Sequence, residues 1–448
     1  MKAEITPKTI AIHTLGCKVN QCDAEALLAR LVEAGFVVGR FDQVSDIYII
    51  NTCTVTQSGD KKSLQMLRRA RRLNPTAFIA ICGCMPRSKA ENIAKVMDAG
   101  ADFVFDTRKP NDLLAKLDAV TQPYLDSSPC SSNKTLPKPK KERTRAFIKI
   151  QDGCDRYCAY CIVPYVRGPA QSRPPSDVLA EVENHIRNQI QEIVLTGIQV
   201  AAYGYDTDNE KCTLPGLIKE INSIAVQSNL VDISAPRLRL SSIDPWAVDD
   251  IFIATIANSP TLCSHFHLSL QSGCNRTLAR MNRRYTTHDY AKAAASLKAL
   301  RPNMALTTDV IVGFPGETDH DFKESMRFVE EMAFSRIHVF EYSPREGTQA
   351  ADFPSQVPSH IKSVRGVKMR TLAKDLQIKF AQAQIGTTTS VLFETKTNDF
   401  PETWQGNSDN YCLVQAQGIN LENTIQNIRI IGITENELIG ELISNFTL

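Results

Sequence analysis

Residues 151–168 read Q-D-G-C-D-R-Y-C-A-Y-C-I-V-P-Y-V-R-G and place Cys154, Cys158 and Cys161 in the spacing C-x-x-x-C-x-x-C. Because glycine and proline punctuate this stretch, we expect a loop. Three thiolates so close in sequence can bind one metal centre, and soft sulfur donors select zinc, copper(I) or iron-sulfur clusters. A structural zinc ion or an ordinary cubane cluster takes four protein ligands, so a group of three leaves one position open.

This spacing resembles the signature of the radical S-adenosylmethionine (SAM) enzymes, and the aromatic Tyr160 before the last cysteine fits that family too. The resemblance implies a 4Fe-4S cluster whose fourth iron is chelated by SAM. Two other interpretations remain open at this point. The three cysteines could form a zinc site with a distant His or Cys, or they could be buried thiols that bind no metal.

Composition and length are those of an ordinary globular protein. The 448 residues are 43% apolar and 22% charged, with a net charge of +2, and we expect two to four domains. Without a membrane-length apolar run or a signal-peptide core, we expect a cytoplasmic protein with no membrane association. The odd count of thirteen cysteines favours metal ligation in a reducing compartment over disulfides. A nearly neutral chain would need local basic patches to hold a nucleic acid.

The N-terminal domain, residues 1–120, is predicted to be an α/β domain with a parallel sheet. Apolar strands alternate with helical stretches, a pattern typical of a sheet covered on both faces. The strands are expected at 9–15, 46–52, 77–81 and 102–105, and the helices near 21–34, 58–73 and 87–99.

Cys17, Cys53 and Cys84 each lie at or just past the carboxyl end of a predicted strand. Since ligands of open α/β sheets bind outside the carboxyl ends of the strands, we predict that these thiols form a second three-cysteine site. The alternative is that each is a packing residue. Cys22 and Cys82 are interpreted as packing residues, although Cys82 is expected on the same strand face as Cys84 and stays an alternative ligand.

Two segments are rich in basic residues. Residues 61–72 carry Lys61, Lys62, Arg68, Arg69, Arg71 and Arg72, which we interpret as the solvated face of a helix, with phosphate contact as the alternative. Residues 121–143 lose all periodicity and collect proline, serine and basic side chains, so we predict a linker.

Residues 144–378 are predicted to form six strand-helix units. Six units are too few for a closed eight-unit barrel, and they resemble the partial (β/α)6 TIM-like barrel of radical SAM enzymes, with the cysteine loop after the first strand. The carboxyl strand ends would form the active site. The SAM-contacting residues expected there, besides Tyr160, are Thr196, Gly197, Ser242, Gln271 and Gly313.

The C-terminal domain is predicted at residues 379–448. A basic helical segment at 360–385 leads into it, and beyond this segment the pattern changes from helical to β-like. Short β-like runs at 388–394, 410–416 and 427–434 predict a small β-barrel or sandwich. For Trp404 and Tyr411 we favour core packing over base stacking.

The order of these parts resembles the methylthiotransferase family over nearly the whole chain. The strings that carry the resemblance are T-L-G-C-K-V-N, N-T-C, G-C-M, the cysteine loop, L-T-G-I, R-L-S-S-I-D-P, H-L-S-L-Q-S-G-C-N and V-G-F-P-G-E-T. The C-terminal string G-N-S-D-N-Y resembles the TRAM domain, an OB-like RNA-binding module. At Lys18, Arg167 and Gly168 the sequence resembles one branch of this family, the enzymes that modify threonylcarbamoyladenosine in tRNA.

The resemblance implies an enzyme with two 4Fe-4S clusters that uses two SAM molecules to methylthiolate ring carbon 2 of threonylcarbamoyladenosine next to the anticodon. It implies as partners the tRNA anticodon arm, a one-electron reductant such as flavodoxin or ferredoxin, and a sulfur donor; we expect a monomer. The alternatives are methylthiolation of isopentenyladenosine in tRNA or of a ribosomal protein aspartyl side chain, and a non-catalytic iron-sulfur or zinc protein that binds RNA.

Overall fold

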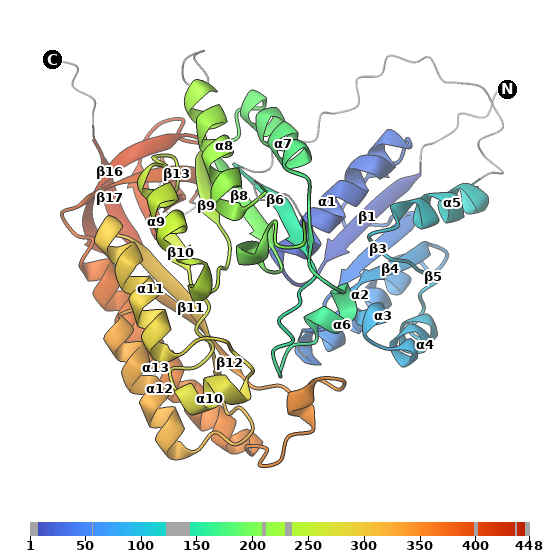
Figure 1. Cartoon of the computed structure of the whole chain (residues 1–448). Coiled ribbons are helices and arrows are strands. Elements are labelled where there is room, and N and C mark those ends of the chain that lie inside the picture. The colour runs from blue at the N-terminus through green and yellow to red at the C-terminus, as the bar shows by residue number, and fades with distance from the viewer. Residues whose placement is uncertain are drawn as a thin grey trace. The chain divides into compact units, whose positions relative to one another are not determined.

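A computed structural model describes residues 8–55, 57–121, 144–207, 212–228, 235–397, 402–434 and 437–443. Within these ranges the chain forms two compact units (Figure 1). The first comprises the described residues up to 121 together with Cys161–Pro169 and Arg345–Gly347, and the second holds the remainder. Apart from Thr121, the predicted linker at 121–143 lies outside the described residues.

The first unit is built on a parallel sheet whose five described strands run in the order β2-β1-β3-β4-β5. The central strand β3 is buried at every position, as expected for a sheet covered on both faces. The strands are β1 (Thr9–Thr14), β2 (Val37–Val38), β3 (Ile47–Thr52), β4 (Phe78–Gly83) and β5 (Phe103–Val104). The helices are α1 (Lys18–Glu33), α2 (Gln57–Leu73), α3 (Cys84–Ser88), α4 (Ala90–Asp98), α5 (Pro110–Thr121) and α6 (Val163–Arg167).

Apolar side chains divide the helices of this unit between the two faces of its sheet. Leu27 and Leu31 of α1 and Leu113 of α5 pack against one face, whereas Leu67 of α2 and Val96 of α4 pack against the other. The spacing of Leu27 and Leu31 puts both on one side of their helix. The predicted N-terminal α/β domain is therefore confirmed, with β2 as a short edge strand that the sequence pattern did not reveal.

The second unit contains six described parallel strands in the order β6-β8-β9-β10-β11-β12, with β7 antiparallel to β6. The sheets β7-β6-β8-β9 and β10-β11-β12 are joined by isolated parallel bridges beside β9 and β10, from Leu238 to Leu262 and from Ile243 to Leu268, and together form one open barrel. The strands are β6 (Arg145–Asp152), β7 (Gln171–Ser172), β8 (Glu192–Gly197), β9 (Arg237–Leu240), β10 (His265–His267), β11 (Ala305–Val312) and β12 (Arg336–Glu341). This confirms the predicted partial barrel.

Helices cover the outer face of this barrel, and apolar residues of alternate strand positions form the core beneath them. Their bounds are α7 (Pro175–Arg187), α8 (Leu214–Ser228), α9 (Asp250–Ala257), α10 (Asn275–Arg280), α11 (Thr287–Leu300), α12 (Asp319–Met332) and α13 (Ser359–Gln382). Thr286 and Thr318 begin α11 and α12 with capping boxes. None of the described helices combines the length and apolar composition needed to cross a bilayer.

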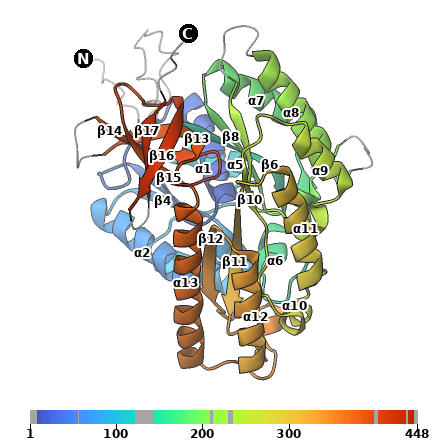
Figure 2. The same ribbon diagram turned by 90° about the vertical axis from the view of Figure 1, so that its left-hand side faces the viewer.

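The C-terminal part of the second unit is a closed barrel of five described strands, reached through α13 (Figure 2). They are β13 (Thr388–Lys396), β14 (Thr403–Ser408), β15 (Leu413–Gln417), β16 (Ile425–Ile433) and β17 (Leu438–Leu442). The predicted small β-barrel is confirmed. Trp404 belongs to its core and donates to the Gly418 carbonyl, and Tyr411 stacks on His265 of β10, so both aromatic rings are used in packing.

A buried ion network joins this small barrel to the amino ends of the larger barrel's strands. Glu192 of β8 is fully buried and contacts Arg237 at 2.5 Å and Arg239 at 2.9 Å. Both arginines also donate to backbone carbonyls of the small barrel, at Asn407 and Asp409. Burial alone would raise the pKa of Glu192, but the charges of Arg239 and Arg237 lower this pKa to about 2. The small barrel therefore closes the end of the larger barrel opposite the cysteine loop.

Replacing Glu192 with Gln should destabilise the second unit. The substitution leaves Arg237 and Arg239 buried without their counter-charge, which typically costs about 3–5 kcal/mol. Urea unfolding of the purified protein measures this free energy. Glu394→Gln is the control, because Glu394 pairs with Arg145 at a half-buried position and its loss should cost less. Equal effects of the two substitutions would contradict the central role of Glu192.

Candidate functional site

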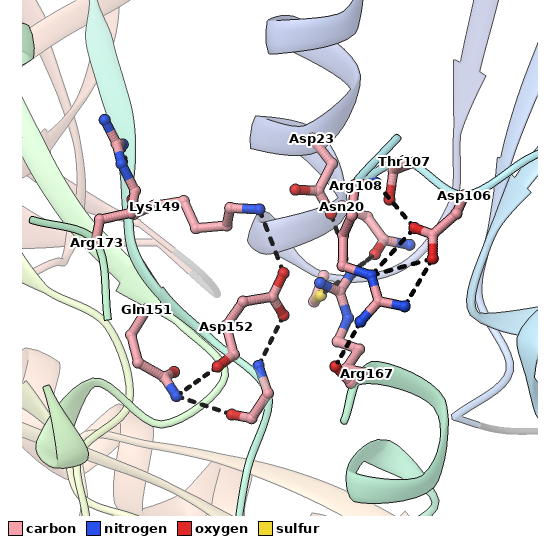
Figure 3. Close-up of polar contacts among 12 residues, drawn as sticks. Asn20, Asp23, Asp106, Thr107, Arg108, Lys149, Gln151, Asp152, Arg167 and Arg173 are labelled. Atoms are coloured by element: carbon pink, nitrogen blue, oxygen red, sulfur yellow. Dashed lines mark hydrogen bonds and ion pairs between the residues drawn. The ribbon is translucent and has the colours of Figure 1, made fainter. Parts of the chain in front are cut away.

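The cysteine loop of the second unit begins where β6 ends. Gln151 donates through its side chain to the carbonyls of Asp152 and Gly153, both at 2.8 Å, and the Asp152 side chain accepts from the Gly153 N–H (Figure 3). Where β6 ends, these bonds supply backbone groups of Asp152 and Gly153 with partners that a neighbouring strand no longer provides. Gly153 has a φ of +70°, a conformation that glycine adopts without strain.

Polar side chains from three other segments surround Cys154 and Cys158. Cys154 Sγ lies 3.0 Å from Gln199 Oε1, and Arg283 donates to Cys158 Sγ at 3.4 Å. Asp244 lies between these two partners, accepting from Gln199 at 2.6 Å and from Arg283 at 2.5 Å. Burial raises the pKa of the Cys154 thiol, and the backbone N–H and the charge of Arg156 oppose this rise.

Sequence reasoning missed Gln199, Asp244 and Arg283. They lie 45, 90 and 129 residues beyond Cys154 by simple subtraction of their numbers, and no local spacing connects them to the loop. Asp244 is part of the R-L-S-S-I-D-P string on which the family resemblance rests. Hydrogen bonds and charges next to cysteine ligands adjust the properties of an iron-sulfur centre.

The structure places Tyr160 and Cys161 on either side of a unit boundary. Tyr160 packs against the apolar group of Met281, Phe314 and Tyr342 in the second unit. Cys161, the third cysteine of the motif, is grouped with the first unit. The motif therefore spans the point at which the chain passes from one unit to the other.

The other residues predicted to contact SAM all lie at carboxyl strand ends of the large barrel. Thr196 and Gly197 end β8, and Ser242 follows β9. Gln271 accepts from Ile311 of β11 through its carbonyl, and Gly313 follows β11 with a φ of +70°. A Cβ added at Gly197 would lie 3.1 Å from the Gln151 carbonyl oxygen, so the absence of a side chain lets β8 approach β6 here.

Glu317 holds the loop that contains Gly313. Its carboxyl group accepts from the backbone N–H groups of Gly313 and Phe314, and Arg365 lies 3.6 Å from its other oxygen. Burial raises the pKa of Glu317 to about 7, against the opposing effect of Arg365 and the two N–H donors.

The structure brings Cys17, Cys53 and Cys84 together in the first unit. Cys17 precedes α1, Cys53 follows β3, and Cys84 begins α3 directly after β4. Burial raises the pKa of Cys53 and of Cys84, and repulsion from the other thiols of the group raises both further. A Cβ added at Gly16 would lie 3.0 Å from Cys53 Sγ, which shows how closely the loop before α1 approaches this thiol.

Two asparagines and a threonine fix the loops that carry these cysteines. Asn20 donates to the carbonyls of Leu15 and Thr52, and Asn51 donates to the carbonyl of Asn20. Thr52 accepts from the Met85 N–H through its hydroxyl group. These are the polar residues of the strings K-V-N and N-T-C, and sequence reasoning assigned them no role.

Arg167 brings a buried positive charge to the same group. Its side chain is 2% exposed, contacts Asn20 and lies 3.3 Å from Asp23, while its carbonyl accepts from Arg108 (Figure 3). Its charge and its hydrogen bond oppose the rise in the pKa of Cys84. Because the thiolate is the form that binds metal, a cation at this position favours ligation.

Cys82 is separated from this group, and the expectation that it shares a strand face with Cys84 is wrong. β4 ends at Gly83, so Cys84 belongs to α3 and the alternation of a strand does not apply to it. Cys82 is fully buried among apolar residues such as Ile49 and Ala80, where burial raises its pKa. Cys84 instead packs against Ile162 and Val166.

The basic run of α2 is a solvated face, as predicted, except at Arg71: Lys61, Lys62, Arg68, Arg69 and Arg72 are all exposed. Arg71 donates to the carbonyls of Ala77 and Gly100 and forms an ion pair with Asp102 at 2.7 Å. It therefore ties α2 to the loops around β5, which makes it a structural residue.

Both thiol groups have the donor chemistry that iron-sulfur clusters require. The group in the first unit offers three thiols next to one buried guanidinium, and Ile162 and Val166 add an apolar cover. In the second unit, Cys158 receives a hydrogen bond from Arg283. Soft sulfur ligands with hydrogen bonds to sulfur fit such clusters.

Comparison with known proteins identifies the family. One family model, described as the uncharacterized protein family UPF0004, matches residues 9–106, and the radical SAM superfamily matches residues 148–329. The threonylcarbamoyladenosine tRNA methylthiotransferase MtaB of Bacillus subtilis (strain 168) is 36% identical over 425 residues, covering 92% of this chain and 90% of the relative. This chain belongs to the methylthiotransferase family of radical SAM enzymes.

Other relatives of this methylthiotransferase carry two different names. The MtaB protein of Chlamydia pneumoniae is 34% identical, with 97% of this chain and 98% of the relative covered. The tRNA-2-methylthio-N(6)-dimethylallyladenosine synthase of Oceanobacillus iheyensis is 32% identical, with 98% of this chain and 85% of the relative covered.

A solved structure shares the fold of this methylthiotransferase. The radical SAM methyltransferase TsrM from Kitasatospora setae, with tryptophan and a SAM analogue bound, has a TM-score of 0.55 and 14% identity. The match covers 88% of this chain and 79% of that chain. As a radical SAM enzyme, the methylthiotransferase uses a 4Fe-4S cluster and SAM.

Replacing Glu317 with Gln should change how stability depends on pH. A carboxyl group whose pKa is raised from 4.5 to about 7 contributes stability below pH 4.5 and loses it as the pH rises through 7. The variant has no such group, so between pH 5 and pH 8 it should gain about 2–3 kcal/mol relative to the wild type. Urea unfolding at a series of pH values measures the difference.

Asp319→Asn is the matched control for this experiment, since Asp319 pairs with the same Arg365 but is exposed. Asp319→Asn should not gain free energy of unfolding relative to the wild type between pH 5 and pH 8. Parallel pH profiles of the wild type and Glu317→Gln would contradict the raised pKa.

Proposed function

We propose that this methylthiotransferase attaches a methylthio group to ring carbon 2 of threonylcarbamoyladenosine next to the anticodon of tRNA. The observation that carries the proposal is the second three-thiol group, Cys17, Cys53 and Cys84, held at the strand ends of the first unit. A radical SAM enzyme that only generates a radical needs one cysteine group, whereas sulfur attachment also needs a sulfur source. The MtaB name of several relatives supports the choice of nucleoside.

In this proposal Cys154, Cys158 and Cys161 hold one 4Fe-4S cluster, and Cys17, Cys53 and Cys84 hold a second. When bound, the first supplies the electron that cleaves SAM to methionine and a 5′-deoxyadenosyl radical, and the second supplies the sulfur. The protein's own residues position the reactants within about 3–3.5 Å of one another. A first SAM molecule would provide the methyl group and a second one the radical.

The surrounding side chains have distinct roles in this scheme. Arg283 and Arg167 each place one fixed cation beside a group of thiolates, and Gln199 and Asp244 keep Arg283 in place. Gly197 and Gly313 are the strand-end residues whose backbone would face the adenosyl group. The roles of Tyr160, Thr196, Ser242 and Gln271 in binding SAM belong to this proposal.

We assign tRNA binding to the C-terminal barrel together with basic surface residues. Small barrels of this size bind single-stranded or looped RNA through side chains on their surface. A flavodoxin or ferredoxin would deliver the electron, and a sulfur donor would restore the second cluster. The anticodon arm must present its adenine outside the base stack, because ring carbon 2 is inaccessible within it.

A second candidate substrate is isopentenyladenosine in tRNA. The dimethylallyladenosine synthase name of relatives at 32–33% identity favours it. Mass spectrometry of tRNA nucleosides from cells that lack the gene separates the two candidates: loss of the methylthio form of threonylcarbamoyladenosine supports the proposal, and loss of the isopentenyl form refutes it. An unchanged nucleoside profile would direct attention to a protein substrate.

Replacing Cys17, Cys53 or Cys84 with Ala should abolish methylthio product while leaving reductant-dependent cleavage of SAM. Each variant should lose about four irons per chain, the content of one cubane cluster. Iron analysis after anaerobic reconstitution and chromatography of 5′-deoxyadenosine measure the two effects.

Cys82→Ala is the matched control, because Cys82 lies two residues from Cys84 but among apolar neighbours. This variant should bind as much iron as the wild type and still form the methylthio product. If Cys82→Ala loses product while Cys84→Ala retains it, the assignment of ligands is wrong.

A further inference from the structure

Three ionisable side chains from three neighbouring strands meet in the large barrel. They are His267 of β10, Asp309 of β11 and His338 of β12, and their nitrogen and oxygen atoms all lie within 4.8 Å of one another. His267 Nε2 is 3.4 Å from Asp309 Oδ2, and the two imidazole centroids are 6.0 Å apart.

These residues point to the concave side of the barrel. Their strand neighbours Phe266, Val310 and Ile337 belong to the core beneath the outer helices, and successive side chains of a strand point to opposite faces. The side chains of His267 and Asp309 are 12% and 30% exposed, and His338 is exposed. The group is therefore reachable from inside the barrel.

The group lies further from the carboxyl strand ends, and so further inside the barrel, than the predicted SAM-contacting residues. Asp309 and His338 each precede the last residue of their strand by three positions, which corresponds to about 10 Å along a strand. In adenine, the bond from carbon 2 to its substituent and the bond from carbon 6 to N6 point about 120° apart, as at any two meta positions of a six-membered ring. A base whose carbon 2 faces the rim turns its N6 substituent into the barrel, and one orientation about that direction brings the substituent to this group.

One nitrogen of the group faces a carboxylate without forming a hydrogen bond: His267 Nε2 lies 3.4 Å from Asp309 Oδ2. His267 Nδ1 lies 3.1 Å from Thr307 Oγ1, but the buried Nε2 has no hydrogen-bond partner among the described residues. A buried polar atom without a hydrogen bond is costly, so a ligand that supplies one gains free energy here.

A second group of possible metal ligands, Cys274, Asp321 and Glu324, offers no comparable site. Cys274 lies 3.5 Å from Asp321 and 3.3 Å from Glu324, and Asp321 also pairs with Arg276 and caps α12. Its polar atoms are thus engaged by the fold itself.

We propose that His267, Asp309 and His338 form the subsite that binds the acidic N6 substituent of the target adenosine. The inference rests on the proposed function, since threonylcarbamoyladenosine carries a carboxylate, a hydroxyl group and an N–H donor on that side. The imidazoles donate to the carboxylate, and Asp309 accepts from the hydroxyl group or the N–H. Arg336 lies two positions before His338 on the same face of β12 and adds a positive charge.

The subsite also explains discrimination between the two candidate nucleosides. An isopentenyl group is apolar and would leave the imidazoles and the carboxylate without partners inside the barrel. A site built from polar groups rejects a ligand that cannot pair with them. The three residues therefore determine specificity.

His338→Phe in the reconstituted full-length enzyme tests the subsite, because phenylalanine keeps the ring and removes both nitrogens. The substrates are two anticodon stem-loop RNAs that differ only in carrying threonylcarbamoyladenosine or isopentenyladenosine. With the first RNA, kcat/KM should fall about 10- to 100-fold, mainly through KM, as expected for the loss of a charge-assisted hydrogen bond. The preference for the first RNA over the second should fall by at least as much.

His338→Gln, which keeps a donor, should recover part of the loss. His288→Phe is the matched control, since His288 is exposed on the outer helix α11, and it should behave as the wild type. Cleavage of SAM without RNA should be unchanged in His288→Phe.

Two results would overturn the subsite while the proposed function stands. The first is that His338→Phe leaves kcat/KM and the preference between the two RNAs unchanged. The second is that the wild type holds one zinc or iron ion per chain beyond its cluster iron, and that His338→Phe loses this ion. A wild-type enzyme that leaves the threonylcarbamoyl RNA unmodified overturns the proposed function itself, and the subsite with it. The wild-type assay thus distinguishes the two failures.

Discussion

The carboxyl ends of parallel strands meet at one edge of a sheet, and the chemistry of this protein depends on that constraint. Cys53 and Cys84 are 31 residues apart in the chain by subtraction, yet each directly follows a strand of the same sheet. Hydrogen bonds from Asn20 and Asn51 then fix the loops at this edge. Three thiols become neighbours without any short motif, and a soft metal centre can form between them.

Both groups of thiols share one electrostatic feature. Burial raises the pKa of Cys84 and of Cys154 and so disfavours the thiolates that a metal needs. Each group has one buried guanidinium beside a thiol: Arg167 opposes the rise in the pKa of Cys84, and Arg283 donates a hydrogen bond to Cys158. These arginines are held in turn by carboxylates, Asp23 and Asp244. Similar solutions at two sites indicate that stabilising several thiolates in a buried place is the main electrostatic problem of this fold.

Hydrophobic periodicity was sufficient to predict the fold class and most strands. The strands β1, β3 and β4 are apolar runs between turn residues, and they appear close to the expected positions; the barrel has the expected six parallel strands. The short strands β2 and β7 have too few residues to produce a pattern. In the C-terminal barrel, β14 and β17 escaped prediction because glycine and polar residues interrupt their sequences, T-W-Q-G-N-S and L-I-G-E-L.

The site was predictable only where its residues are defined by local position. Strand ends pointed to Cys17, Cys53 and Cys84, whereas the polar partners of the thiols come from distant segments. Arg167 reaches the first unit from a segment beyond the linker, and Gln199, Asp244 and Arg283 come from three separate parts of the barrel. Which side chains converge is decided by tertiary packing, which periodicity does not encode.

In the proposed function, the thiols of the first unit bind a cluster of their own. The most direct test is iron analysis, with electron paramagnetic resonance after reduction, of a reconstituted variant in which Cys154, Cys158 and Cys161 are all replaced by Ala. We expect this variant to hold about four irons per chain and to give the signal of a reduced cubane cluster. A folded variant that holds no iron would contradict the proposed second cluster.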